Sequence, residues 1–126
     1  MGLDMYLMKK MDDGEDKQIM YWRKANMIHN WFIKNADIDE NVTSINCVPI
    51  RVDKGDLKEL RDDIECVLQD HTRAEEILPT CAGFFFGDTE YNHYYYEELF
   101  DTYLKLGKLI KELRNDGSEI YYMCWF

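Results

Sequence analysis

The longest regular pattern in this chain is an amphipathic helix over residues 94–115. One face of this helix is apolar, with large side chains at three- and four-residue spacing: Leu99, Phe100, Tyr103, Leu106, Ile110 and Leu113. The other face carries the pairs Asp101–Lys105 and Lys108–Glu112 at i,i+4 spacing, which is typical of a solvated surface. A helix with one apolar face has to pack on another layer, so the rest of the chain must supply that layer.

Two further helices and several strands are predicted on the same grounds. Helical spacing covers residues 23–36 and 53–69, with Asp53 as the N-cap of the second helix, and a short helical turn at 74–78 ends at Pro79. Strand-like segments lie at 3–11, 19–22, 45–52, 83–87 and 119–126. The turn residues 12–16 join the first two segments, so we expect a hairpin there.

The order of these elements, roughly β(β)αβαβαβ, predicts an α+β fold. In this fold a small mixed β-sheet is packed by about three amphipathic helices. No connecting segment is long enough to act as a linker, so we expect residues 1–126 to form a single domain.

The charge of the chain is strongly acidic and uneven. The formal net charge is -10, and residues 37–101 hold 17 acidic and 5 basic side chains, a net of -12. A field of this sign disfavours direct binding to nucleic acid and to anionic membranes. It favours a basic partner, or it serves solubility alone.

The cysteines and the amino terminus favour a cytoplasmic protein. Cys47, Cys66, Cys81 and Cys124 form no CxxC pair and have no zinc spacing, so we expect reduced thiols and no metal site. The start of the sequence lacks the pattern of a signal peptide, and no apolar run is long enough to span a bilayer. No cofactor is indicated by any motif.

Catalytic motifs are not evident either. Ser44 and Ser118 are the only serines, and neither lies in a nucleophile elbow. Cys66 falls on an acidic helix face, which raises rather than lowers a thiol pKa. A nucleophilic hydrolase is therefore not expected, and a non-catalytic role is favoured while an enzyme stays open.

One candidate pocket surrounds His29, which falls on the apolar face of the helix predicted at 23–36. In one interpretation His29 is a general base or pocket donor. In the other, which we favour, it is a core histidine satisfied by a backbone carbonyl. The residues of the possible pocket are Trp22, Arg23, Asn26, His29 and Phe85.

Candidate partner-binding residues come from three places. Trp31 lies nearly opposite the apolar centre of its helix, so we expect its side chain off the core face, where it could contact a partner. The glycine-bracketed segment 83–87 and the tyrosines after it could line a groove, and Tyr94, Tyr95 and Tyr96 cannot all face the core. The acidic outer face of the helix at 53–69 adds carboxylates. The full predicted set is Trp31, Glu59, Asp62, Asp63, Glu90, Tyr91 and Tyr95.

Several segments together resemble a family of small uncharacterised proteins of bacteriophages, prophages and their bacterial hosts. They are the opening Met-Gly-Leu-Asp-Met-Tyr-Leu, the stretch 22–32 that begins Trp-Arg-Lys-Ala-Asn, the Gly-Phe-Phe-Phe-Gly segment with Thr89-Glu-Tyr91, and the Tyr121–Trp125 end. The resemblance implies a phage accessory protein, and it carries no established activity.

Three functional hypotheses follow, of which only the first depends on this resemblance. The leading one is a non-enzymatic acidic inhibitor of a host protein or ribonucleoprotein defence complex, such as a CRISPR effector. The alternative is a small-ligand or nucleotide-binding protein or enzyme, with its pocket near His29 and the Gly83–Tyr91 segment. The third is a self-associating structural protein, since a homodimer is compatible with the sequence.

Overall fold

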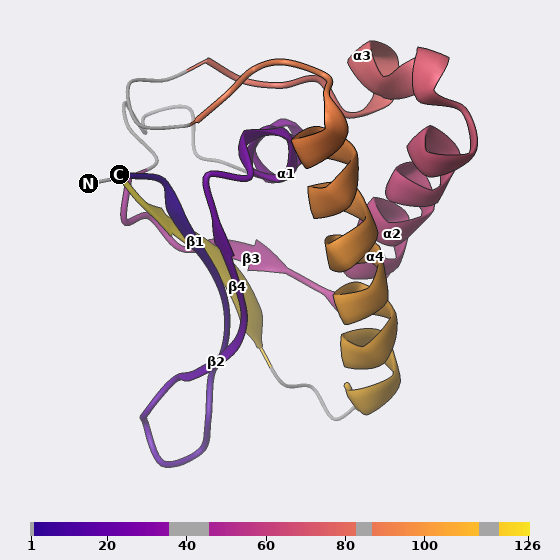
Figure 1. Cartoon of the computed structure of the whole chain (residues 1–126). Helices are drawn as coiled ribbons and strands as arrows, with labels where there is room; N and C mark the ends of the chain where they lie inside the picture. Colours follow the sequence, from indigo (N-terminus) through magenta and orange to yellow (C-terminus); the bar gives the residue numbers. More distant parts are fainter. Residues whose placement is uncertain (1, 36–45, 83–86, 114–118) are drawn as a thin grey trace.

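The computed structural model describes residues 2–35, 46–82, 87–113 and 119–126 (Figure 1). It has an α+β fold, as the sequence predicts. A four-stranded sheet has the strand order β2-β1-β4-β3. Its strands are β1 (Asp4–Lys9), β2 (Lys17–Arg23), β3 (Ile50–Val52) and β4 (Ile120–Trp125).

All three strand ladders are antiparallel. Among the described residues, a parallel element enters only through an isolated bridge between Asn46 and Cys124. The hairpin predicted at the amino terminus is present, and Gly14 with a φ of 84° lies in its turn, a conformation that favours glycine. The first and last strands of the chain are the two central strands of the sheet.

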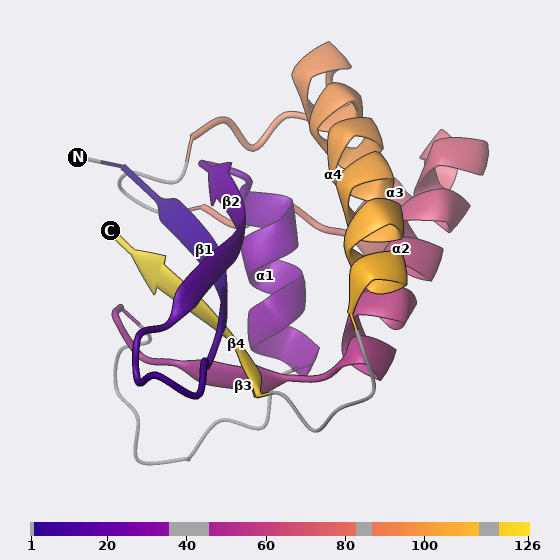
Figure 2. The same cartoon turned by 90° about the horizontal axis from the view of Figure 1, so that it is seen from below.

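The helices are α1 (Asn26–Asn35), α2 (Lys54–Gln69), the 3-10 turn η1 (His71–Arg73), α3 (Ala74–Ile77) and α4 (His93–Glu112). They lie on the same side of the sheet, and α1 lies between the sheet and the α2–α4 pair (Figure 2). The inward side chains of the strands, from Met5 and Leu7 to Tyr122 and Cys124, are buried under these helices. The core therefore has sheet on one side of α1 and helices on the other.

Local chemistry fixes where the helices begin. Asp53 is the N-cap of α2, as predicted, and forms a capping box with Asp56. The helix predicted at 23–36 starts only at Asn26, because Lys24 has a φ of 56°, which a right-handed α-helix does not accommodate, and Arg23 still belongs to β2. Gly87 lies against that bend, and a Cβ at Gly87 would be 3.1 Å from the Lys24 Cβ.

The remaining boundaries differ modestly from the prediction. The helix predicted at 94–115 spans His93–Glu112, and the strand predicted at 45–52 shortens to Ile50–Val52. The short strand predicted at 83–87 lies almost wholly outside the described residues.

Candidate functional site

His29 is a fully buried core histidine. Its Nδ1 lies 2.5 Å from the phenolic oxygen of Tyr122, and the Tyr122 ring stacks on Phe32 at a centroid distance of 4.2 Å. Burial lowers the pKa of His29 to about 4 and raises the pKa of Tyr122 well above its usual value. Both side chains are therefore neutral at physiological pH, which is poor tuning for a general base at that pH.

The other predicted pocket residues have structural partners. The Trp22 indole donates to Thr102 Oγ1 at 2.9 Å inside the core. Asn26, also buried, donates to the Asp88 carbonyl at 2.9 Å and accepts from the Cys81 amide at 3.0 Å. Arg23 is exposed and pairs with Asp4 at 3.8 Å, and Phe85 lies outside the described residues. Trp22, Asn26 and His29 thus hold β2, α1, α4 and β4 together.

One small groove does bring three predicted residues together. Its volume is about 220 Å³, and Arg23, Glu90 and Tyr95 are among the side chains that line it. The groove lies where the end of β2 meets the start of α4, beside Gly87.

The expectation that Trp31 faces away from the core is wrong. Its side chain is 5% exposed, and its indole donates to Asp63 Oδ2 at 2.8 Å. The physical reason is that α1 is covered on two sides, so a residue opposite the sheet packs toward α2 instead of toward water. Tyr95 is buried as well and donates to the Leu78 carbonyl at 2.8 Å. Neither residue is available to a partner.

The remaining partner-binding candidates are spread over the helical side. Glu59 and Asp62 are exposed on α2, while Asp63 is half-buried on Trp31. Glu90 is exposed, and the Tyr91 hydroxyl accepts from the Thr80 amide at 3.1 Å. The prediction that one of the three adjacent tyrosines stays at the surface is confirmed, because Tyr94 is 74% exposed.

A group of aromatic side chains lies on the sheet face turned away from the helices. We call this surface the open sheet face. In the strand register, Tyr6 stands beside Tyr21 and Met123, and Tyr121 stands beside Met8 and Arg51. Trp125 is 62% exposed and Tyr21 is 39% exposed. The face comprises Asp4, Tyr6, Met8, Tyr21, Arg23, Arg51, Tyr121, Met123 and Trp125.

Contacts within the chain hold several of these side chains in place. The Tyr21 hydroxyl donates to Asp4 Oδ1 at 2.6 Å, and the Tyr6 and Tyr21 rings lie 5.3 Å apart. The Tyr121 hydroxyl donates to Asp16 of the hairpin turn at 2.5 Å. Both bonds raise the pKa of the tyrosine that donates, in the case of Tyr121 to about 12. The phenols therefore stay protonated and oriented at physiological pH.

The same face contains a groove. The groove has a volume of about 370 Å³, and its lining includes Asp16, Pro49, Arg51, Tyr121 and Met123.

Sequence reasoning missed this face because the pattern of these strands is ambiguous. Residues 4–8 and 120–125 are apolar or aromatic at nearly every position, so their period-two pattern does not say which side faces the core. Open faces of antiparallel sheets are ordinarily polar, and here tyrosine, tryptophan and methionine occupy that position instead.

Antiparallel packing of α2 and α4 places most acidic side chains toward one end of the helix pair and most basic side chains toward the other. Arg61 Nε donates to the Tyr103 carbonyl at 3.4 Å, and the His71 ring stacks on Tyr96 at 3.8 Å. The C-terminal half of α2 therefore lies near the start of α4. The described residues between positions 63 and 101, which we call the acidic end, hold 10 acidic side chains and a single lysine or arginine, Arg73. Basic residues gather at the opposite end of the helix pair.

Neither a metal-binding cluster nor a helix fit to span a membrane is found in the described part of the chain. Residues 2–35, 46–82, 87–113 and 119–126 contain no group of three or more histidine, cysteine or acidic side chains that could hold a metal ion. None of the helices described is long and apolar enough to cross a membrane. Comparisons with protein-family models, with curated proteins and with solved structures find no match.

Proposed function

We propose that this chain acts by binding another protein, with the open sheet face as its contact surface. The observation that carries the proposal is the group of aromatic side chains Tyr6, Tyr21, Tyr121 and Trp125 on the side of the sheet turned away from the helices. Tyrosine, tryptophan, methionine and arginine are the residue types enriched at protein interfaces, and this face is composed mostly of them.

Rigidity supports the same proposal. A side chain that is already fixed loses less conformational entropy when a partner binds, so its burial converts more fully into affinity. The bonds from Tyr21 to Asp4 and from Tyr121 to Asp16 fix two of the aromatic rings. The buried aromatic residues Trp31 and Tyr95 stabilise the fold instead.

We further propose that the partner is a host protein or ribonucleoprotein defence complex, met in the cytoplasm of a bacterial host. The resemblance to phage and prophage accessory proteins supports this setting. The acidic end supports a partner with a basic surface, such as a nucleic-acid channel, because opposite charges accelerate encounter and favour the correct partner. Affinity should then fall steeply with added salt.

The test is quantitative affinity capture from host lysate with three versions of the protein. Wild type and Tyr94→Ala, an exposed tyrosine on α4, should retain the same stoichiometric partner. A Tyr21→Ala, Trp125→Ala double variant should lose more than nine-tenths of it, while its circular dichroism spectrum stays that of a folded protein. Equal retention by the double variant would refute the proposed surface.

A small-ligand or nucleotide pocket remains a second candidate. Its support is the 220 Å³ groove that Arg23, Glu90 and Tyr95 line. A nucleotide and metabolite binding screen tests it directly, with Arg23→Gln expected to abolish any hit at that groove. A hit that survives Arg23→Gln would place the ligand elsewhere.

A further inference from the structure

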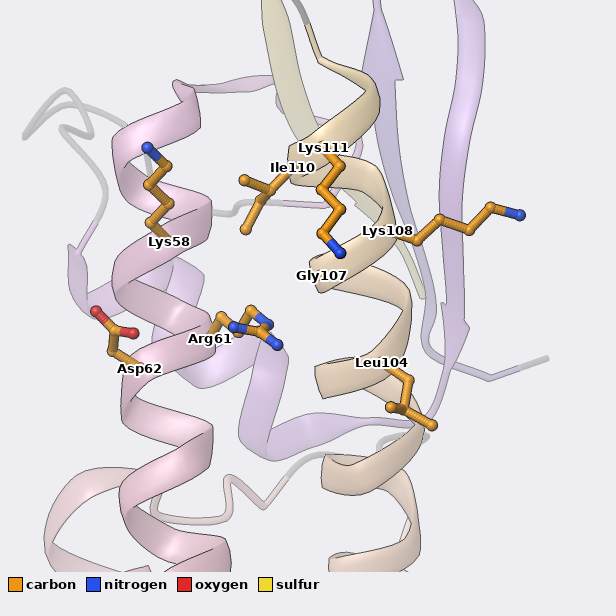
Figure 3. Close-up of a pocket in the computed structure, with 8 residues that line it drawn as sticks. All are labelled: Lys58, Arg61, Asp62, Leu104, Gly107, Lys108, Ile110 and Lys111. Carbon is orange, nitrogen blue, oxygen red and sulfur yellow. The ribbon is translucent and has the colours of Figure 1, made fainter.

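A third concave surface lies between α2 and α4, nearer to the start of α2 and the end of α4 than the acidic end is. It has a volume of about 630 Å³, and we call it the cationic groove. Its lining residues are Lys58, Arg61, Asp62, Leu104, Gly107, Lys108, Ile110 and Lys111. Figure 3 shows Arg61 and Lys111 reaching over the space beside Gly107, with Lys58 at the α2 rim and Asp62 turned away.

Arg61 is held in position at the floor of the groove. Its guanidinium lies 4.0 Å from the centre of the Tyr103 ring, and its Nε donates to the Tyr103 carbonyl. Gly107 makes room for it, because a Cβ at this position would be 3.1 Å from Arg61 Nε and 3.2 Å from Nη2. A glycine in the middle of a helix lowers helix stability, so its presence here suits a need for close approach.

The cations of the groove have no carboxylate partners. Within the described ranges, none of Lys58, Arg61, Lys108 and Lys111 forms an ion pair, whereas Lys105 on the same helix pairs with Asp101 at 2.8 Å. Four cations and one acid, Asp62, line the concavity, and this surplus of positive charge is unexpected in a chain whose net charge is -10. Like charges held together in this way repel each other until an anion binds between them.

We propose that the cationic groove binds a small polyphosphate-bearing anion, a ligand that the protein-binding role does not require. Arg61 presents planar N–H donors suited to phosphate oxygens, and Lys111 and Lys58 add point charges on either side. The volume matches the range of small-molecule sites. A long nucleic acid is disfavoured because its phosphates would continue toward the acidic end of the same two helices.

Nuclear magnetic resonance with inorganic triphosphate tests this proposal. Gly107 is one of only 7 glycines, so its amide signal falls in a sparse region of the spectrum and reports on the centre of the groove. Triphosphate at constant ionic strength should shift the amide signals of Gly107 and its neighbours with a saturable curve at millimolar concentration or below. The open sheet face should not respond.

Matched variants decide whether the groove itself is responsible. Arg61→Gln and Lys111→Gln should each weaken triphosphate binding about tenfold, the usual effect of losing one charge-assisted hydrogen bond. Gly107→Ala should weaken it too, because the added methyl group displaces the guanidinium. Lys105→Gln removes the same charge from α4 outside the groove and should change affinity less than about twofold.

Two results would overturn the proposal. One is the absence of any shift of the Gly107 amide signal at millimolar triphosphate. The other is a loss of affinity in Lys105→Gln as large as in Lys111→Gln, which would mean a diffuse charge effect. Loss of the capture partner in the sheet-face experiment would leave this result unaffected, since the two surfaces share no residue.

Discussion

The Nδ1 atom of His29 and the phenolic oxygen of Tyr122 lie 2.5 Å apart in the core, where α1 packs on β4. The pair joins the central layer of the fold to the sheet through two polar side chains that are neutral at physiological pH. Its contribution to stability therefore depends on pH in a direction that can be worked out.

Acidification through the range from pH 6.5 to pH 4 should destabilise the fold through His29. The pKa of His29 is about 4 in the folded chain, below the ordinary value of 6.5, so the unfolded chain binds the proton first. The stabilisation is complete above pH 6.5 and falls by about 3 kcal/mol on the way to pH 4. Urea unfolding at several pH values measures this loss. The plot of unfolding free energy against pH should become flatter in His29→Gln and keep its slope in Phe32→Leu. An unchanged slope in His29→Gln would contradict the assignment.

Removal of the Tyr122 hydroxyl should destabilise the protein by about 1–3 kcal/mol, because it takes a hydrogen-bond partner from a buried ring nitrogen. Tyr122→Phe keeps the stacking on Phe32, so its unfolding free energy isolates the polar contact. Tyr94→Phe, at an exposed position on α4, should change stability by less than about 0.5 kcal/mol. Equal stability of the two variants would show that the contact contributes nothing.

Neighbouring acids on α2 should respond differently to substitution. Asp63→Ala removes the acceptor of the Trp31 indole and should cost about 1–3 kcal/mol, since the indole N–H is then left without that partner inside the fold. Asp62→Ala, one residue away and exposed, should cost less than about 0.5 kcal/mol. Thermal or urea unfolding of the two variants measures the difference, and a larger loss from Asp62→Ala would exclude this role for Asp63.

Tyr121 should ionise late in an alkaline titration followed by ultraviolet absorbance. Its hydrogen bond to Asp16 raises the pKa to about 12, so the contact stabilises the fold below pH 10 and is lost as the pH rises toward 12. Asp16→Asn should move one tyrosine transition down toward pH 10. Asp13→Asn changes the same turn without touching Tyr121 and should leave that transition in place.

Much of the secondary structure follows from local sequence, because caps and periodicity act over a few residues. Asp53 predicts the start of α2, and the apolar spacing of α4 predicts most of its length. Lys24 could not be anticipated, since a lysine with positive φ carries no sequence signature. Trp31 is buried because α2 covers the far side of α1. This is tertiary packing, which helical periodicity alone does not predict.

The site was harder to foresee than the fold for a similar reason. The open sheet face depends on which side of β1 and β4 the helices choose, and both sides carry apolar side chains. The cationic groove depends on α2 and α4 running antiparallel, which brings Arg61 beside Gly107 although 46 positions separate them in the chain. Both surfaces arise only when distant segments meet.

The position of β4 beside β1 has a consequence for folding during synthesis. The ribosome synthesises β1 before β4, and about 110 residues separate these two adjacent strands in the sequence. Until β4 is made, the nascent chain can form the β1–β2 hairpin and individual helices, while the inner surface of β1 has no completed sheet around it. The inner edge of β1 therefore waits for β4 while the roughly 110 residues between the two strands are synthesised, and a fragment that ends before β4 would be prone to aggregation.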